Sequence, residues 1–148
     1  MKSLSARLIG RTFVVAHKHV WCRPTAAGSV QFGLTERGLD DVGDVTSVQL
    51  SDSRILQLDW EGYTQTSADE LYHTVWESVE GTLEVEAPVV GSVVNLVDLE
   101  TEGEIDAESV LGEVLCSEDS LLEASNDWIP VRDYEETMLR APNGLFAA

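Results

Sequence analysis

Lysine is scarce in this chain, because only Lys2 and Lys18 occur and none follows residue 18. Nine lysines and arginines stand against 27 aspartates and glutamates, which gives a formal net charge of −18. A surface of this sign repels nucleic-acid phosphates and anionic lipid headgroups, so we expect no direct binding to nucleic acid or membrane. Long hydrophobic runs are missing as well, since no stretch reaches the roughly 18 apolar residues of a membrane-spanning helix.

Cysteine is also scarce, and this excludes a disulfide framework. Only Cys22 and Cys116 occur, which agrees with a reducing compartment and favours two buried thiols. The 148 residues fit one domain, with or without tails. The hydrophobic content of 43% and the four tryptophans favour a soluble globular protein with a packed interior over a disordered chain.

Positive charge is concentrated at the N-terminal end. Five of the nine basic residues precede the first acid, Glu36: Lys2, Arg7, Arg11, Lys18 and Arg23. Residues 1–12 have no acid, contain arginine and serine, and place Leu4 and Leu8 at helical spacing. Two interpretations fit this segment equally, a short mitochondrial transit peptide and an ordinary basic N-terminus. On the first interpretation we expect a mitochondrial protein on the matrix side.

Short apolar or alternating segments predict strands along most of the chain. The clearest is 28–36, where apolar residues at 30, 32 and 34 alternate with polar or small ones. Further strands are predicted at 13–15, 20–21, 45–50, 54–60, 82–87, 91–99, 109–116 and 127–131. Helices are predicted only at 120–125 and 132–140, with at most one turn at 36–44. This pattern predicts a mainly β sandwich or barrel with short helices.

The segment WESVEGTLEVEAPVVG, residues 76–91, predicts two short strands around a tight turn. Glu80 and Gly81 would form the tip, since glycine tolerates the positive φ that such turns favour. Val79, Leu83 and Val85 would give the hairpin its apolar contacts with the sheet.

Several motifs keep the spacing of one known family. HVW (19–21) matches a His-Glu-Trp strand, and FGLTERGLDDVGDV (32–45) matches Val-Gly-Ile-Thr followed at the same distance by Gly-Asp. ESVEGTLEVEAPVVG (77–91) matches Glu-Ser-Val-Lys and Ala-Pro-Val-Ser-Gly with their spacing intact, and DWIPV (127–131) matches a Gly-Trp-Leu strand less closely. On these motifs the chain resembles the lipoyl-carrier H-protein family of the glycine cleavage system.

The resemblance implies a lipoyl/biotinyl-carrier-like β-sandwich, a barrel-sandwich hybrid, over residues 13–132. Two apparent insertions lie near 52–69 and 99–118, a basic segment occupies 1–12, and a C-terminal helix and tail occupy 133–148. The family attaches lipoate to a lysine on the hairpin, at the position of Glu80, next to Glu77, Ser78, Val79 and Gly81. Attachment requires an amine nucleophile, so with Glu80 in this place we expect no lipoyl group and no other cofactor.

Other residues suggest metal sites only weakly. His17 and His19 would share a face of a strand with Cys22 nearby, but a zinc site usually needs four ligands at suitable spacing. DLETEGEIDAES (98–109) is similar to a calcium loop, yet its twelfth position is Ser109 in place of a bidentate glutamate. We therefore expect no metal, and interpret the loop as a solvated acidic segment or a docking element for a basic protein surface.

No catalytic motif appears in the sequence, and we expect no enzyme activity. Candidate interaction residues are aromatic or acidic: Trp60, Tyr63, Glu80, Glu100, Glu102 and Glu104. Trp76 fits the core and an interface equally well. We expect a non-catalytic, structural or interaction subunit that binds protein partners in a larger, mitochondrial assembly. The alternatives are a regulator or decoy associated with glycine cleavage or lipoate-handling enzymes and, more weakly, a cation-binding module.

Overall fold

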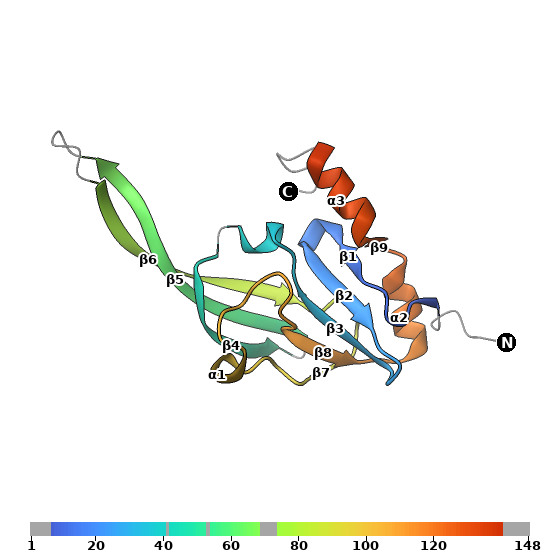
Figure 1. Ribbon diagram of the computed structural model, residues 1–148. Coiled ribbons are helices and arrows are strands. Elements are labelled where there is room, and N and C mark those ends of the chain that lie inside the picture. The colour runs from blue at the N-terminus through green and yellow to red at the C-terminus, as the bar shows by residue number, and fades with distance from the viewer. Residues whose placement is uncertain (1–6, 41, 53, 69–73, 141–148) are drawn as a thin grey trace.

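Two antiparallel sheets form the framework of the protein (Figure 1). The computed structural model describes residues 7–40, 42–52, 54–68 and 74–140. The large sheet has the order β7-β8-β3-β2-β1-β9 and the small sheet the order β4-β5-β6. The large sheet comprises β1 (Phe13–Val15), β2 (Val20–Pro24), β3 (Ser29–Leu34), β7 (Ser92–Val94), β8 (Gly112–Leu115) and β9 (Trp128–Pro130). The small sheet comprises β4 (Asp44–Asp52), β5 (Ile55–Ala68) and β6 (Thr74–Glu86). The predicted mainly β, sandwich-like class is confirmed.

The helices are short and lie around the sheets. They are the 3₁₀ turns η2 (Ala16–Lys18) and η3 (Arg37–Leu39) and the α-helices α1 (Leu99–Glu102), α2 (Glu118–Ser125) and α3 (Val131–Arg140). Helix α2 begins two residues earlier than predicted because Ser117 caps it, its Oγ accepting a bond of 3.1 Å from the backbone N–H of Ser120. Two acids in the first turn also favour this start.

The main core lies between the two sheets. The alternation predicted for 28–36 is confirmed, because Val30, Phe32 and Leu34 are buried in this core. Leu56 and Leu58 face them from β5 and are fully buried. Removing apolar side chains of this size from water stabilises a fold by about 1.5–3 kcal/mol each, so the contact between the sheets is the main source of stability.

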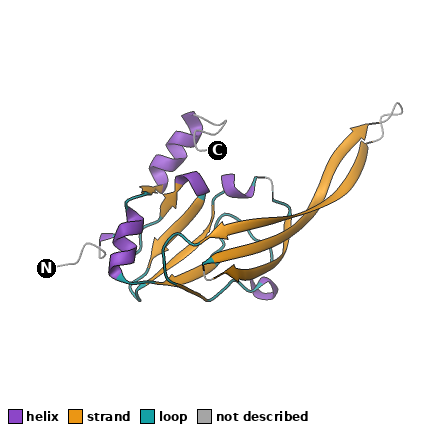
Figure 2. Cartoon of the chain, turned by 180° about the vertical axis from the view of Figure 1, so that it is seen from behind, coloured by secondary structure: helices purple, strands orange, loops and turns teal. Residues whose placement is uncertain are grey.

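A second, smaller core covers the outer face of the large sheet. Val14 and Trp21 point away from the main core and pack with Tyr134 of α3. Figure 2 shows α3 beside the β1–β9 end of the large sheet. Gly33 gives Trp21 room, since a Cβ there would lie 2.7 Å from the indole ring. Helix α3 thus belongs to the folded body.

The small sheet extends into a two-stranded ribbon. Asp44, the first residue of β4, pairs with Glu61 of β5. From Gly62 to Ala68, β5 therefore pairs with β6 alone, without β4 on its other edge. Figures 1 and 2 both show this ribbon projecting from the body. The strand predicted at 54–60 therefore continues to Ala68, through most of the first apparent insertion.

The tight turn predicted at Glu80-Gly81 is wrong. Strand β6 runs without a break from Thr74 to Glu86, with Glu80 paired to Glu61 and Gly81 paired to Trp60. The φ of Gly81 is not positive, and Glu-Gly lacks the Asn or Asp that favours two-residue turns. Pairing with β5 continues through positions 80 and 81 and keeps the chain extended there.

Three further expectations need correction. The strand predicted at 91–99 is limited to β7, and the loop predicted at 98–109 contains α1, whose N-cap Asp98 accepts a 3.0 Å bond from Glu100 N–H. His17 and His19 do not share a strand face, because His17 lies in η2 and His19 follows it with φ of 54°. Residues 1–6 of the basic segment and the tail at 141–148 lie outside the described residues.

Candidate interaction surface

Two exposed aromatic side chains share one face of the ribbon. Tyr63 of β5 pairs with Ser78 of β6, and Trp76 pairs with Gln65. Directly paired residues, and residues two apart on a strand, lie on the same face of a sheet. Tyr63 is 76% exposed and Trp76 61% exposed. They are diagonal neighbours, a relation that sets residues roughly 7–8 Å apart in antiparallel sheets.

Carboxylates lie next to these aromatics on the same face, on the side where β4 joins the sheet. Asp44, Glu61 and Glu80 form one rung across β4, β5 and β6, and all three side chains are exposed. Like charges placed directly opposite each other destabilise a sheet, so this rung has a cost in the isolated protein. We name the ribbon face by its six residues: Asp59, Glu61, Tyr63, Trp76, Ser78 and Glu80.

Asp59 fixes the end of the ribbon face nearest the body. Its carboxylate accepts bonds of 2.9 Å from Thr82 Oγ1, 2.9 Å from Ser47 Oγ and 3.3 Å from Gln57 Nε2. These bonds, that from Thr82 foremost, lower the pKa of Asp59. Since the donors come from all three strands, Asp59 ties the small sheet together where the ribbon begins.

Trp60 lies on the opposite face of the ribbon and is half-buried. A Cβ added to Gly81 would lie 2.5 Å from Trp60 Cζ2, and one added to Gly43 would lie 3.0 Å from Trp60 Cε3. The indole therefore covers two glycines. Of the two aromatic residues predicted for interaction, Tyr63 is the one that solvent reaches most.

The acidic segment 98–109 is separate from the ribbon face. Glu100 and Glu104 are exposed, and Glu102 is the last residue of α1. Helix α1 contacts β4, and Figure 1 shows it on the side of the small sheet away from the projecting ribbon. The predicted acidic candidates therefore divide into two places, with Glu80 on the ribbon and the others around α1.

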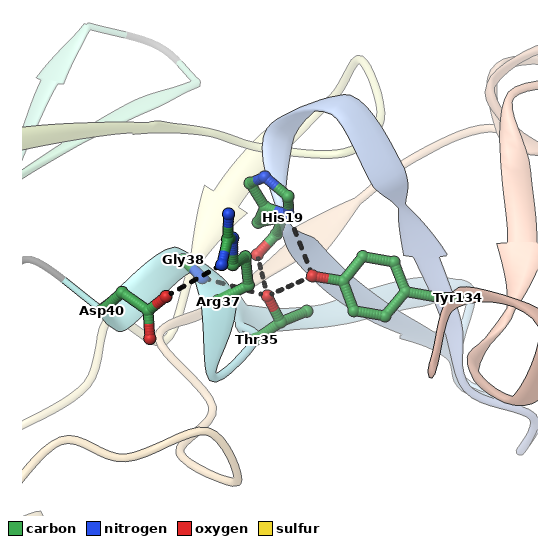
Figure 3. A network of polar contacts seen from close by, with 6 residues as sticks. All are labelled: His19, Thr35, Arg37, Gly38, Asp40 and Tyr134. Carbon is green, nitrogen blue, oxygen red and sulfur yellow. Dashed lines mark hydrogen bonds and ion pairs between the residues drawn. The ribbon is translucent and has the colours of Figure 1, made fainter. Parts of the chain in front are cut away.

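The two histidines of the N-terminal half have different surroundings. His17 is exposed, whereas His19 Nδ1 lies 2.9 Å from Tyr134 Oη (Figure 3). Thr35 Oγ1 donates to the His19 carbonyl at 3.1 Å and lies 3.1 Å from Tyr134 Oη. Burial lowers the pKa of His19. Because Thr35 uses its only proton on that carbonyl, Tyr134 donates to Thr35 and accepts from His19 Nδ1–H.

Cys22 is not grouped with the histidines. It is buried in the main core, and burial raises the pKa of its thiol. Within the described residues, no three His, Cys, Asp or Glu side chains are arranged to hold a metal ion. His73 lies outside those residues.

A hollow of about 410 Å³ opens beside η2 and the body end of β6. Lys18 Nζ lies 2.8 Å from Glu86 Oε2 at its edge, and Arg54 pairs with the other oxygen of Glu86. These contacts, the bond from Lys18 foremost, lower the pKa of Glu86. The Lys18 ammonium and the Arg54 guanidinium thus both form ion pairs with the Glu86 carboxylate.

Sequence reasoning missed Asp44, Asp59 and Glu61, because their importance depends on strand pairing. A usable signal was present in the distribution of cations. The chain has no lysine or arginine between Arg54 and Arg132, so neither β5 nor β6 contains a basic residue of either type. No charge of opposite sign on these strands offsets the acids of the ribbon face.

Comparisons with protein-family models, with curated proteins and with solved structures gave no match. Among the described helices, none has the length and apolar character needed to cross a bilayer. The resemblance to the H-protein family therefore depends on the motifs in the sequence.

Proposed function

We propose that this protein is a non-catalytic interaction subunit of a larger assembly, built on a lipoyl-carrier-like β domain without a lipoyl group. The observation that carries the proposal is the pair of exposed aromatics, Tyr63 and Trp76, on a ribbon that projects from the body. Tyrosine and tryptophan are enriched at the positions that contribute most to protein–protein binding. A projecting ribbon also reaches a partner without rearrangement of the core.

The residue at position 80 supports the non-lipoylated part of the proposal. Glu80 is an exposed carboxylate in the middle of β6, opposite Glu61. A carboxylate would give lipoate only a hydrolysable anhydride, whereas a lysine would give a stable amide. Kinship with carrier domains is supported by the spacing of the motifs at 32–45 and 77–91, while the extended strand at position 80 departs from the expected hairpin.

A mitochondrial location is part of the proposal and is supported by the acid-free composition of residues 1–12. The alternative, a decoy for lipoate-handling enzymes, is supported by Glu77 and Ser78, which precede position 80 and are exposed. That role would require the tip of a tight turn, so the continuous strand favours an interaction subunit.

The test is affinity purification of the tagged full chain from its own cells, with intact mass measured on the purified protein. We expect an unmodified mass and a constant set of co-purifying proteins. The same purification with the variant Tyr63→Ser/Trp76→Ser should lose that set. A lipoyl adduct on the wild-type chain, or a chain that purifies alone, would contradict the proposal.

A further inference from the structure

The ribbon face has a composition that selects one class of partner. We propose that it docks an extended segment of a partner protein that carries lysine or arginine at alternate positions. This inference rests on the proposed function and specifies the partner's chemistry. The ribbon face carries carboxylates at Asp59, Glu61 and Glu80, and two exposed rings at Tyr63 and Trp76.

The two kinds of group on this face recognise the same ligand. The faces of tryptophan and tyrosine rings attract ammonium and guanidinium groups, and carboxylates accept charge-assisted hydrogen bonds from them. A cation placed between the Glu61–Glu80 rung and Tyr63 would meet both. An apolar partner would leave the carboxylates of this rung desolvated and unpaired, which is costly.

The spacing of the rungs favours an extended partner segment. Glu61 and Tyr63 are two residues apart on β5, as are Ser78 and Glu80 on β6. Because a strand rises about 3.3 Å per residue, successive rungs on one face lie roughly 6.6 Å apart. Alternate side chains of an extended segment have the same repeat, so its basic residues would reach successive rungs.

The distribution of charge argues against two other occupants. A second copy of the chain would bring another net charge of −18 and no cation on the same strands, since none occurs between Arg54 and Arg132. Nucleic acid is anionic and would be repelled by the acidic rung. The cost of the like-charge rung in the free protein is relieved when cations of a partner bind there.

The test measures binding of the full chain to a synthetic peptide of about ten residues that alternates threonine and lysine, long enough to cover the ribbon face. Binding is followed by titration calorimetry and by the tryptophan emission, at about 0.15 M NaCl, where the Debye length is about 8 Å. We expect saturable binding that a threonine–glutamate peptide of the same length does not show. The variant Tyr63→Ser/Trp76→Ser should bind about tenfold more weakly with an unchanged melting temperature, because both rings are exposed.

A matched pair of charge variants separates this face from general electrostatic attraction. Glu61→Gln/Glu80→Gln and Glu100→Gln/Glu104→Gln each remove two carboxylates, the first pair from the ribbon face and the second from the region of α1. We expect the first variant to weaken binding about fivefold or more and the second by less than about twofold. Equal losses, no saturable binding by wild type, or equally tight binding of the small polycation spermine would overturn the inference.

The two proposals fail in different ways. Partners that co-purify from cells equally with wild type and with Tyr63→Ser/Trp76→Ser would overturn the ribbon-face inference and leave an assembly role in place. Peptide binding by a chain that purifies alone from cells would overturn the assembly role and support the chemistry of the face.

Discussion

At the scale of single residues, the position of Glu80 in the structure differs most from the position that the sequence predicted. As a hairpin tip it would project into solvent with its partners far away. In the structure it is one member of a rung of three acids and faces Glu61 directly. The sequence shows that position 80 carries a glutamate in place of a lysine. It does not show that Glu80 lies opposite Glu61, because this strand pairing joins residues nearly twenty positions apart in the chain.

The substitution Glu80→Lys should stabilise the isolated protein. It replaces a like-charge pair with an opposite-charge pair, and such cross-strand pairs differ by about 0.5–1 kcal/mol, which raises Tm by about 2–3 °C at this chain length. Thermal unfolding at low salt measures the effect.

Glu84→Lys is the matched control for this change, because Glu84 lies on the same strand but pairs with the neutral Gln57. It makes the same change in net charge without removing a like-charge pair. A larger gain in Tm for Glu84→Lys than for Glu80→Lys would show that the Glu61–Glu80 pair has no specific cost.

A second residue-scale prediction concerns the contact of Trp60 with Gly81. Gly81→Ala should destabilise the protein by about 1–3 kcal/mol, since its Cβ would lie 2.5 Å from the indole and force the ring to move. Chemical denaturation measures the free energy of unfolding.

Gly62→Ala serves as the control on the neighbouring strand. Its Cβ would meet Gly43 Cα at 3.6 Å and Trp60 Cζ3 at 4.0 Å, both ordinary contacts that do not force the ring to move, so we expect no loss of stability or a small gain. Equal destabilisation by both substitutions would mean that any side chain at a ribbon glycine is harmful, and that the Trp60 contact is not the cause.

At the scale of elements, alternation was a good guide to β3 and a poor guide to β6. The apolar residues of 28–36 define one buried face without interruption. In β6, the glycine next to an acid led to the prediction of a turn. The structure instead has one strand of thirteen residues, paired with β5, that passes through this glycine without turning. The projecting ribbon could not be predicted from apolar patterning, because none of its described residues beyond Glu61 belongs to either core.

Helix α3 gives the prediction at this scale. Tyr134→Phe removes the hydroxyl that meets Thr35 and His19 and should cost about 1 kcal/mol. Hydrogen exchange of the α3 amides should accelerate by about fivefold, because this energy opposes local opening of the helix. Tyr63→Phe, a change at an exposed ring, should leave exchange in α3 unaltered. Unchanged α3 exchange in Tyr134→Phe would mean that packing alone holds the helix.

At the scale of the whole molecule, the charge balance determines how the protein responds to salt. A net charge of −18 on 148 residues disfavours the compact state through self-repulsion. Raising NaCl from about 0.01 M to about 1 M shortens the Debye length from about 30 Å to about 3 Å. We expect Tm to rise by about 5 °C or more, equivalent to about 2 kcal/mol.

The variant Glu100→Gln/Glu104→Gln, with two fewer charges, should show a smaller rise in Tm over the same salt range. A melting temperature that falls with salt in the wild-type chain would contradict the account of self-repulsion.

The class of fold was predictable from the sequence because many short strands with punctuating glycine, proline and aspartate have few alternatives to a mainly β structure. The division into two sheets with β4-β5-β6 as a separate unit was not, since it depends on long-range pairing. For the same reason Tyr63 was found as a candidate by residue type, whereas its relation to Trp76 and to the acidic rung required the register.

The central claim, that the ribbon face joins this chain to a larger assembly, is tested most directly by the size of the native complex. Extracts of the source cells are fractionated by size at physiological salt, and the chain is followed by immunodetection. The account predicts that the wild-type chain migrates in a complex much larger than its own 16.2 kDa, and that Tyr63→Ser/Trp76→Ser migrates as the free chain. A wild-type chain that migrates at its own mass, or a variant that stays in the complex, would contradict it.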